Sequence, residues 1–149
     1  MAAALLALAA PLAADALSLN PDVRSDTVDA TICQVGYTRT VRPSTTYTNG
    51  VKLRLMREAG IDPAQAREYE LDHIIPLALG GSPRSLENLM LQPWDGENGA
   101  KRKDKLEVRL QKCVCAGALD LTEAQAAIAA DWQEASRRYS HLHCGRHRG

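Results

Sequence analysis

The stretch that decides the fold is "YELDHIIPLALGG", Tyr69–Gly81, in which an aspartate and a histidine stand side by side within an apolar run. The run predicts a β-strand that ends near Pro76, and the glycine pair at its end predicts a loop. Neighbouring side chains of a strand point to opposite faces, so Asp72 and His73 can flank one site only where the strand twists or ends. The pair therefore calls for a chemical or a structural explanation.

Downstream of this pair, the sequence predicts a loop, a second strand and a helix in that order. The second apolar run, "NLMLQPW", is compatible with a hairpin partner, and a helical pattern begins at Asn98. Asn88 follows the loop, Asn98 opens the helix, and a basic run comes directly after it: Lys101, Arg102 and Lys103.

These polar residues suit the hydrolysis of a phosphate ester. The carboxylate of Asp72 and the amide oxygen of Asn98 are hard ligands of the kind that Mg²⁺ takes, and Mg²⁺ keeps waters that phosphate oxygens can replace. A neutral imidazole such as that of His73 is a suitable general base, because its ordinary pKa lies near 6.5. The helix start adds N–H groups that favour an anion.

The segment "DHIIPLALGG...ENLMLQPWDGENGAKRKDK" resembles the motif of the HNH, or ββα-metal, endonucleases. The resemblance rests on "LDHIIPL", "GG", "NL" and "N-x-x-K", in this order and at suitable spacing, over roughly a quarter of the chain. It implies an α+β fold with a ββα-metal core, to which the rest of the sequence adds helices and a short N-terminal β segment. It also implies a metal-dependent endonuclease that cuts DNA, with RNA as a second substrate, and has little sequence specificity.

The resemblance assigns a role to each residue of the motif. His73 would be the general base that activates water, and Asp72 and Asn98 would be the two metal ligands. Asn88 would act by hydrogen-bonding the backbone, which holds the loop and orients His73. Asn98 stands where many members have histidine, so Mg²⁺ is favoured, Mn²⁺ comes second and Zn²⁺ is disfavoured.

For the nucleic acid substrate, the resemblance makes Lys101 the best phosphate contact, with Arg102 or Lys103 as substitutes. The alternative is that these residues form an ordinary solvated basic face of the helix. Likewise, Asp72 could be a strand-end residue, His73 a hydrogen-bonded core histidine, and the two asparagines turn and cap residues. The corresponding alternative functions are a non-catalytic HNH-like binding module and a structural zinc or disulfide protein.

Length, charge and the N-terminal sequence bound these predictions. The chain has 149 residues, 18 basic and 18 acidic, which predicts one domain and gives no overall sign of a nucleic-acid partner. Residues 1–16 are apolar and end near an A-x-A pattern, which predicts a signal peptide and a secreted or periplasmic protein. The predicted domain is 17–149, with its motif core at 68–114 and no stable membrane association. The oligomeric state is left open.

Four cysteines, an even number in a small chain, predict two disulfides. Cys113 and Cys115 are separated by one residue and are expected to bond to different partners. Cys33 can therefore pair with either, and Cys144 with the other. The rival interpretation is a zinc site formed by the cysteines and the C-terminal histidines, His141, His143 and His147.

The rest of the sequence predicts supporting elements. Residues 31–47 are β-branched and predict one or two short strands. Asn49 is expected to cap a helix over 50–60. A final helix begins after 121, where Thr122 and Gln125 have the spacing of a capping box.

Overall fold

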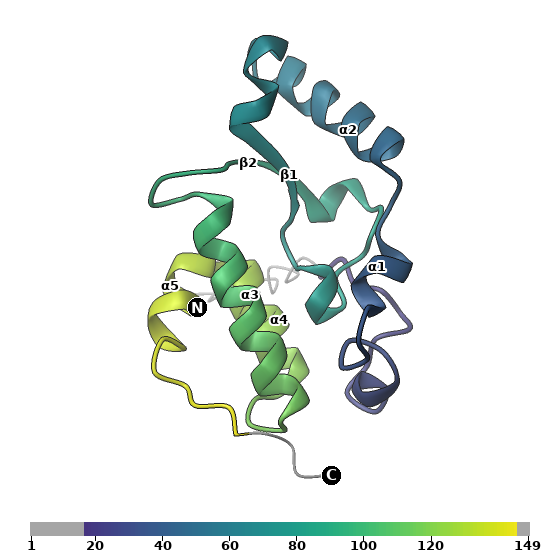
Figure 1. The fold of residues 1–149 in the computed structure, drawn as a ribbon, viewed down its shortest axis with the longest axis vertical. Helices are drawn as coiled ribbons and strands as arrows, with labels where there is room; N and C mark the ends of the chain where they lie inside the picture. The colour runs from purple at the N-terminus through teal and green to yellow at the C-terminus, as the bar shows by residue number, and fades with distance from the viewer. Residues whose placement is uncertain (1–16, 146–149) are drawn as a thin grey trace, which may run out of the picture.

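The computed structural model describes residues 17–145, which form an α+β fold built around one hairpin and one central helix (Figure 1). The N-terminal residues predicted to be a signal peptide lie outside the described part. Short 3₁₀ helices occupy Val28–Ala30, Pro63–Glu68, Leu77–Leu79 and Leu86–Asn88. The main elements are α1 (Tyr37–Val41), α2 (Thr45–Glu58), β1 (Tyr69–His73), β2 (Leu89–Pro93), α3 (Ala100–Cys115), α4 (Leu121–Ala130) and α5 (Trp132–Arg138).

The two predicted strands pair as an antiparallel hairpin, with Asp72 opposite Met90 and His73 opposite Leu89. The first strand ends at His73, earlier than the sequence predicts. The cause is Asn88, whose backbone oxygen accepts from the Ile74 N–H at 2.8 Å and whose side chain accepts from the Ile75 N–H at 2.8 Å. A side chain thus continues the hydrogen bonding where the strand ladder stops.

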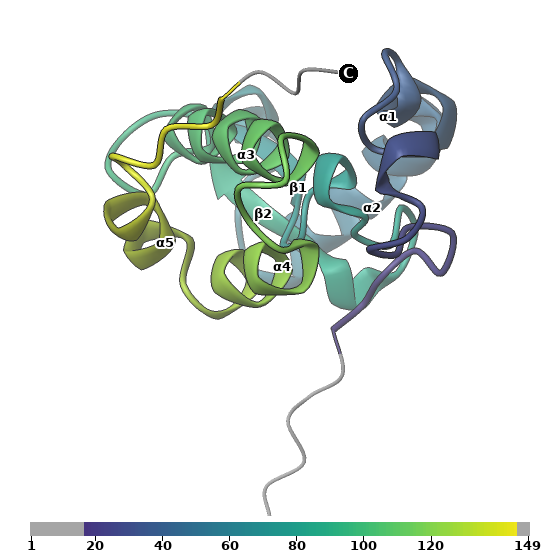
Figure 2. The same cartoon turned by 90° about the horizontal axis from the view of Figure 1, so that it is seen from below.

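The core forms where α3 packs against α4 and α5 (Figures 1 and 2). Buried residues recur at every third or fourth position of α3, as expected for one face of a helix, apart from the adjacent pair at its end. Its buried members are Ala100, Lys103, Leu106, Leu110, Cys113 and Val114. One of these six is a lysine, whose ammonium is held inside the protein by three oxygen acceptors.

The predicted N-terminal β segment is wrong, because residues 31–47 are mainly turn and helix. Ser44 caps α2 by accepting from the Tyr47 N–H, and Val51 and Met56 are buried by the helix, so capping and packing outweigh the β propensity of the threonines. Asn49 lies inside α2 and does not cap it.

The final helix is two helices, and its predicted capping box is absent. Asp131 has an extended backbone, ends α4 and caps α5 by accepting from the Glu134 N–H at 2.9 Å. The N-cap of α4 is Asp120, and Thr122 lies inside the helix. Gln125 is buried and donates to the Leu79 carbonyl at 2.8 Å, so it braces the loop after β1.

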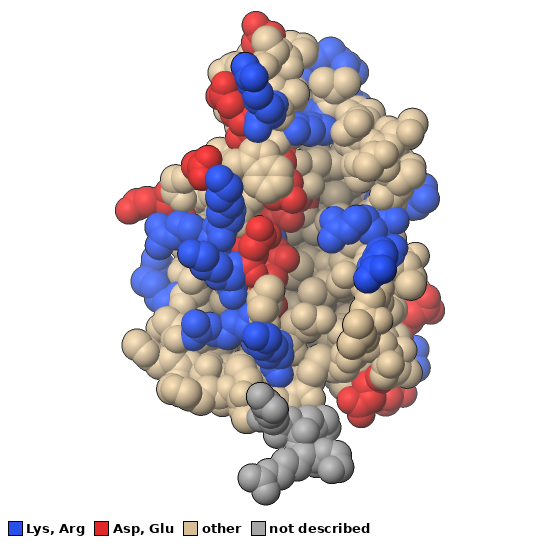
Figure 3. Space-filling view, viewed as in Figure 1, with Lys and Arg blue, Asp and Glu red and all other residues tan. Residues whose placement is uncertain are grey.

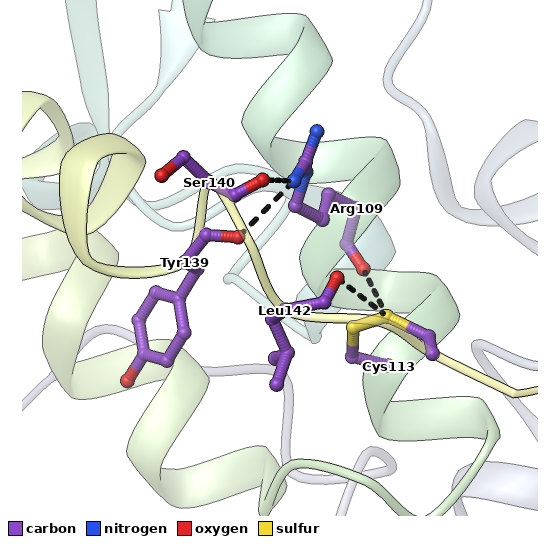
Figure 4. Close-up of a disulfide and its surroundings, with 6 residues drawn as sticks. Arg109, Cys113, Tyr139, Ser140 and Leu142 are labelled. Atoms are coloured by element: carbon purple, nitrogen blue, oxygen red, sulfur yellow. Dashed lines mark hydrogen bonds between the residues drawn. A yellow bond between two sulfur atoms is a disulfide. The ribbon is translucent and has the colours of Figure 1, made fainter.

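Both predicted disulfides are present, and the structure selects one of the two pairings. Cys33 bonds to Cys115. Cys113 bonds to Cys144, and Figure 4 shows this second disulfide. The second bond fixes the C-terminal segment along α3, where Arg109 also donates to the carbonyls of Tyr139 and Ser140. Two disulfides suggest an oxidising environment, extracellular or periplasmic. Within residues 17–145, no helix is both long and apolar enough to span a membrane.

Candidate functional site

Asn88 closes the loop between the strands from inside. Its side chain is 1% exposed and makes three backbone hydrogen bonds: it accepts from the Ile75 N–H at 2.8 Å and donates to the carbonyls of Ile75 at 2.9 Å and Ser82 at 3.0 Å. Gly81 makes room for this arrangement, since a Cβ there would collide with the Ile75 carbonyl and lie 2.7 Å from Asn88 Nδ2. The backbone bonds expected of Asn88 are present, and its place in a catalytic site stays a prediction.

His73 lies under the same loop. Its Nε2 is 3.1 Å from the Pro83 carbonyl, and because a carbonyl can only accept, Nε2 carries the proton and Nδ1 the lone pair. Burial lowers the pKa of His73, and the opposing effects of the Pro83 hydrogen bond and Asp72 do not cancel it. The imidazole is therefore neutral at pH 7, the state that a general base requires.

Asp72 is held by a buried ammonium. Lys103 is 1% exposed, and its Nζ donates to Asp72 Oδ2 at 2.8 Å, to the His73 carbonyl at 2.7 Å and to Glu107 Oε1 at 2.6 Å. These three acceptors use all three N–H groups of the ammonium. Asp72 Oδ1 accepts from the His73 N–H at 2.7 Å. Lys103 thus ties the end of β1 to α3.

Several carboxylates surround the single ammonium of Lys103. Burial tends to lower the pKa of Lys103, but the attraction of Glu107 and Asp72 outweighs it and raises the pKa, so Lys103 is charged. Burial and nearby carboxylates raise the pKa of Glu107 and of Asp104, against the effect of Lys103. Glu70 has one buried carboxylate oxygen without a partner among the described residues, and burial with repulsion from Asp72 raises its pKa to about 7.

The two predicted metal ligands have different hydrogen-bond partners in the structure. Asn98 is exposed, and its side-chain oxygen accepts from Gln133 Nε2 at 2.9 Å, whereas both oxygens of Asp72 accept from Lys103 and from the His73 backbone. A cation already lies against Asp72, so this arrangement does not fit a divalent ion held by Asp72 and Asn98. Among residues 17–145, no group of three His, Cys, Asp or Glu side chains is placed to hold a metal. The metal prediction stays a prediction.

The predicted phosphate contacts separate into exposed and buried residues. Lys101 and Arg102 are exposed on α3, and Lys101 pairs with Asp95 at 2.7 Å. Lys103 is the exception, because three acceptors hold its ammonium inside the protein, where it cannot reach a phosphate. Figure 3 shows basic side chains gathered over α3 beside a group of acidic ones. The exposed basic residues of α3 are Lys101, Arg102, Lys105, Arg109 and Lys112.

The ion cluster of Lys103 and Glu107 was not predicted from the sequence, although a signal for it was present. Lys103 falls on the same helical stripe as Ala100, Leu106 and Leu110, which marks it as inward-facing. Glu107 follows at i+4, the spacing of a helical ion pair. Glu70, two residues before Asp72 on β1, shares a strand face with it.

Comparison with protein-family models, curated proteins and solved structures finds no match for this chain.

Proposed function

We propose that this chain is an HNH-type endonuclease that hydrolyses phosphodiester bonds in DNA, with RNA as a second substrate, and has little sequence specificity. The observation that carries the proposal is the arrangement at the end of the hairpin. Asn88 fixes the loop from within, and the loop carbonyl of Pro83 holds His73 Nε2 at 3.1 Å. This interaction fixes the tautomer and orientation that a general base needs.

In this proposal, His73 Nδ1 accepts a proton from water as the water oxygen attacks phosphorus. The bond from phosphorus to the leaving oxygen breaks, and that oxygen takes a proton from solvent. Because His73 is only 7% exposed, little of its surface is accessible to the attacking water. Asn88 is a positioning residue, since it acts through the loop and does not touch the substrate.

The exposed cations of α3 support a polyanionic substrate. Lys101 has a side chain 62% exposed, and an exposed ion pair such as that with Asp95 contributes little, so a phosphate can replace the carboxylate at low cost. Binding through such residues weakens as salt rises. Contacts of this kind read the backbone and give little sequence preference.

No step of this mechanism passes through a metal ion, because the ammonium of Lys103 occupies the space beside Asp72. The divalent cofactor implied by the resemblance, Mg²⁺ before Mn²⁺ and Zn²⁺, stays part of the proposal as a condition to be varied in the cleavage assay. Export to the periplasm or the exterior also belongs to the proposal, supported by the two disulfides.

A plasmid-nicking assay tests the proposal, run with Mg²⁺, with Mn²⁺ and with EDTA. We expect His73→Ala to lose roughly 10²- to 10⁴-fold in rate, the usual contribution of a general base. His141→Ala is the matched control, because His141 is exposed on the C-terminal segment and should leave the rate unchanged. Equal cleavage by the wild type and His73→Ala would show that the mechanism is wrong.

A non-catalytic binding module is the second candidate, and the buried ion cluster favours it. Asp72 is fully engaged by Lys103 and the His73 backbone, an arrangement that stabilises a scaffold without needing catalysis. DNA binding without cleavage under all three metal conditions would support this candidate. All four cysteines are paired in disulfides, which disfavours a zinc site built on them.

A further inference from the structure

We infer that the ammonium of Lys103 is the resident cation of this site and takes the place of a divalent metal beside Asp72. Lys103 would then be a positioning residue that fixes Asp72 and the His73 backbone from α3. This inference deepens the proposed function, on which its meaning for catalysis rests, but it concerns binding and can be measured without nucleic acid.

The distances around Lys103 fit an ammonium and not a magnesium ion. Its Nζ has oxygen neighbours at 2.6, 2.7 and 2.8 Å, from Glu107, the His73 carbonyl and Asp72. Charge-assisted N–H···O bonds measure about 2.7–2.9 Å, whereas Mg²⁺ requires oxygens at about 2.0–2.1 Å. The three oxygens therefore lie at distances that suit an ammonium and are too long for Mg²⁺.

The chemistry of the acceptors is nevertheless that of a cation site. Two carboxylates and one backbone carbonyl converge on a single buried point, and oxygen ligands of these types are what hard divalent ions select. The acceptors come from two elements, β1 and α3, so whatever cation they share fixes the strand end against the helix. Lys103 supplies that cation from within the chain.

Two consequences follow for the protein in solution. A divalent ion can reach Asp72 only if the Lys103 side chain leaves a pocket in which it is 1% exposed, so the wild type should not bind such an ion there. Removing the ammonium should leave a space lined by oxygen atoms, with unpaired carboxylates that now attract a divalent ion.

The test measures Mn²⁺ binding by the loss of the free-ion electron paramagnetic resonance signal, with folding checked by circular dichroism. For the wild type and Asp72→Asn, we expect superimposable isotherms up to millimolar Mn²⁺. For Lys103→Ala, we expect one added Mn²⁺ per chain, displaced by Mg²⁺ and lost again in the Lys103→Ala/Asp72→Asn double variant. Lys105→Ala, which removes an exposed lysine of the same helix, should gain none.

Two results would overturn the inference. One is a wild type that binds one Mn²⁺ per chain and loses it on Asp72→Asn. The other is a folded Lys103→Ala protein that gains no Mn²⁺. If Lys103→Ala does not fold, the comparison of the wild type with Asp72→Asn decides alone.

The two proposals fail in distinguishable ways. If no variant cleaves DNA but the Mn²⁺ isotherms are as expected, the endonuclease proposal is refuted and the role of Lys103 is supported. If the wild type cleaves DNA in an EDTA-sensitive reaction and binds Mn²⁺ through Asp72, the endonuclease proposal is supported and the role of Lys103 is refuted.

Discussion

The two ends of α3 are held to the protein by different forces. Near its start, the buried ammonium of Lys103 binds Asp72, Glu107 and the His73 backbone. At its far end, Cys113 and Cys115 anchor it covalently, and Leu110 and Val114 pack into the core. The covalent and apolar end supplies stability, whereas the ionic end orients charges at a cost in desolvation. This division suggests that the first end serves the site and the second serves the fold.

The largest effect is expected from breaking the covalent end. Loss of a disulfide restores conformational entropy to the unfolded chain. For the separation of 82 residues between Cys33 and Cys115, this should lower the free energy of unfolding by about 4.5 kcal/mol. The same relation gives about 3.7 kcal/mol for the separation of 31 residues between Cys113 and Cys144. Denaturant unfolding of the two paired Cys→Ala variants measures both values. The reverse order would show that the C-terminal segment contributes more than its loop length predicts.

An effect between those of the two disulfides is expected from breaking the ionic end. Lys103→Met keeps most of the side-chain volume but leaves buried carboxylates unpaired, which should reduce the free energy of unfolding by about 4 kcal/mol. The triple variant Lys103→Met/Asp72→Asn/Glu107→Gln removes the charges together and should recover most of that loss. Lys105→Ala, on the exposed face of α3, should stay within about 0.5 kcal/mol of the wild type. If Lys103→Met lowered the free energy of unfolding by no more than Lys105→Ala does, the buried ion cluster would be contradicted.

The apolar contribution of the far end can be measured separately. Leu110 is fully buried, and Leu110→Ala should cost about 3 kcal/mol through lost burial and the cavity that remains. Val108 is 50% exposed on the same helix, so Val108→Ala should change stability by less than about 0.5 kcal/mol. Chemical denaturation of both variants gives the comparison. Similar losses at the two positions would mean that α3 is oriented differently.

A smaller effect, which should depend on pH, is expected from Glu70, because its side chain is only half-buried and solvent screens its charge. Its folded pKa of about 7 lies above the ordinary value of 4.5, so protonated Glu70 stabilises the fold below pH 4.5 and this contribution is lost as the pH rises to about 7. Glu70→Gln cannot ionise, so it should be more stable than the wild type above pH 7, with a difference that shrinks as the pH falls through this window. Unfolding curves across this range measure it.

The matched control for this variant is Glu68→Gln, at an exposed position just before β1. Its stability difference from the wild type should not change across the same pH range. A pH-independent difference for Glu70→Gln would contradict the raised pKa.

Sequence reasoning predicted the hairpin and α3 because their patterns are local. The strand around Asp72 and the helix after Asn98 follow from short-range periodicity and turn residues. The helix over 50–60 was predicted, but its start at Thr45 and the helix α1 were missed, since Ser44 capping and the burial of Val51 and Met56 outweigh a β-branched composition. The break at Asp131 was missed because Asp is common inside and between helices.

The candidate site was predicted in part for the same reason. The contacts of Asn88 span the loop that the motif itself defines, so the resemblance could indicate them. The partner of Asp72 could not be read from the motif, because Lys103 lies 31 positions away and its burial depends on how α3 packs. Likewise, two disulfide pairings were equally compatible with the sequence, and only the position of α3 relative to the N-terminal segment selects between them.

The disulfide between Cys33 and Cys115 has a consequence for survival after proteolysis. His73, Asn88, Asp72 and Lys103 all lie between the two cysteines. A single peptide-bond cut anywhere in that interval leaves both fragments on one covalent molecule. A nicked protein would therefore keep every residue of the candidate site at high local concentration, and would come apart only when a reductant opens the ring.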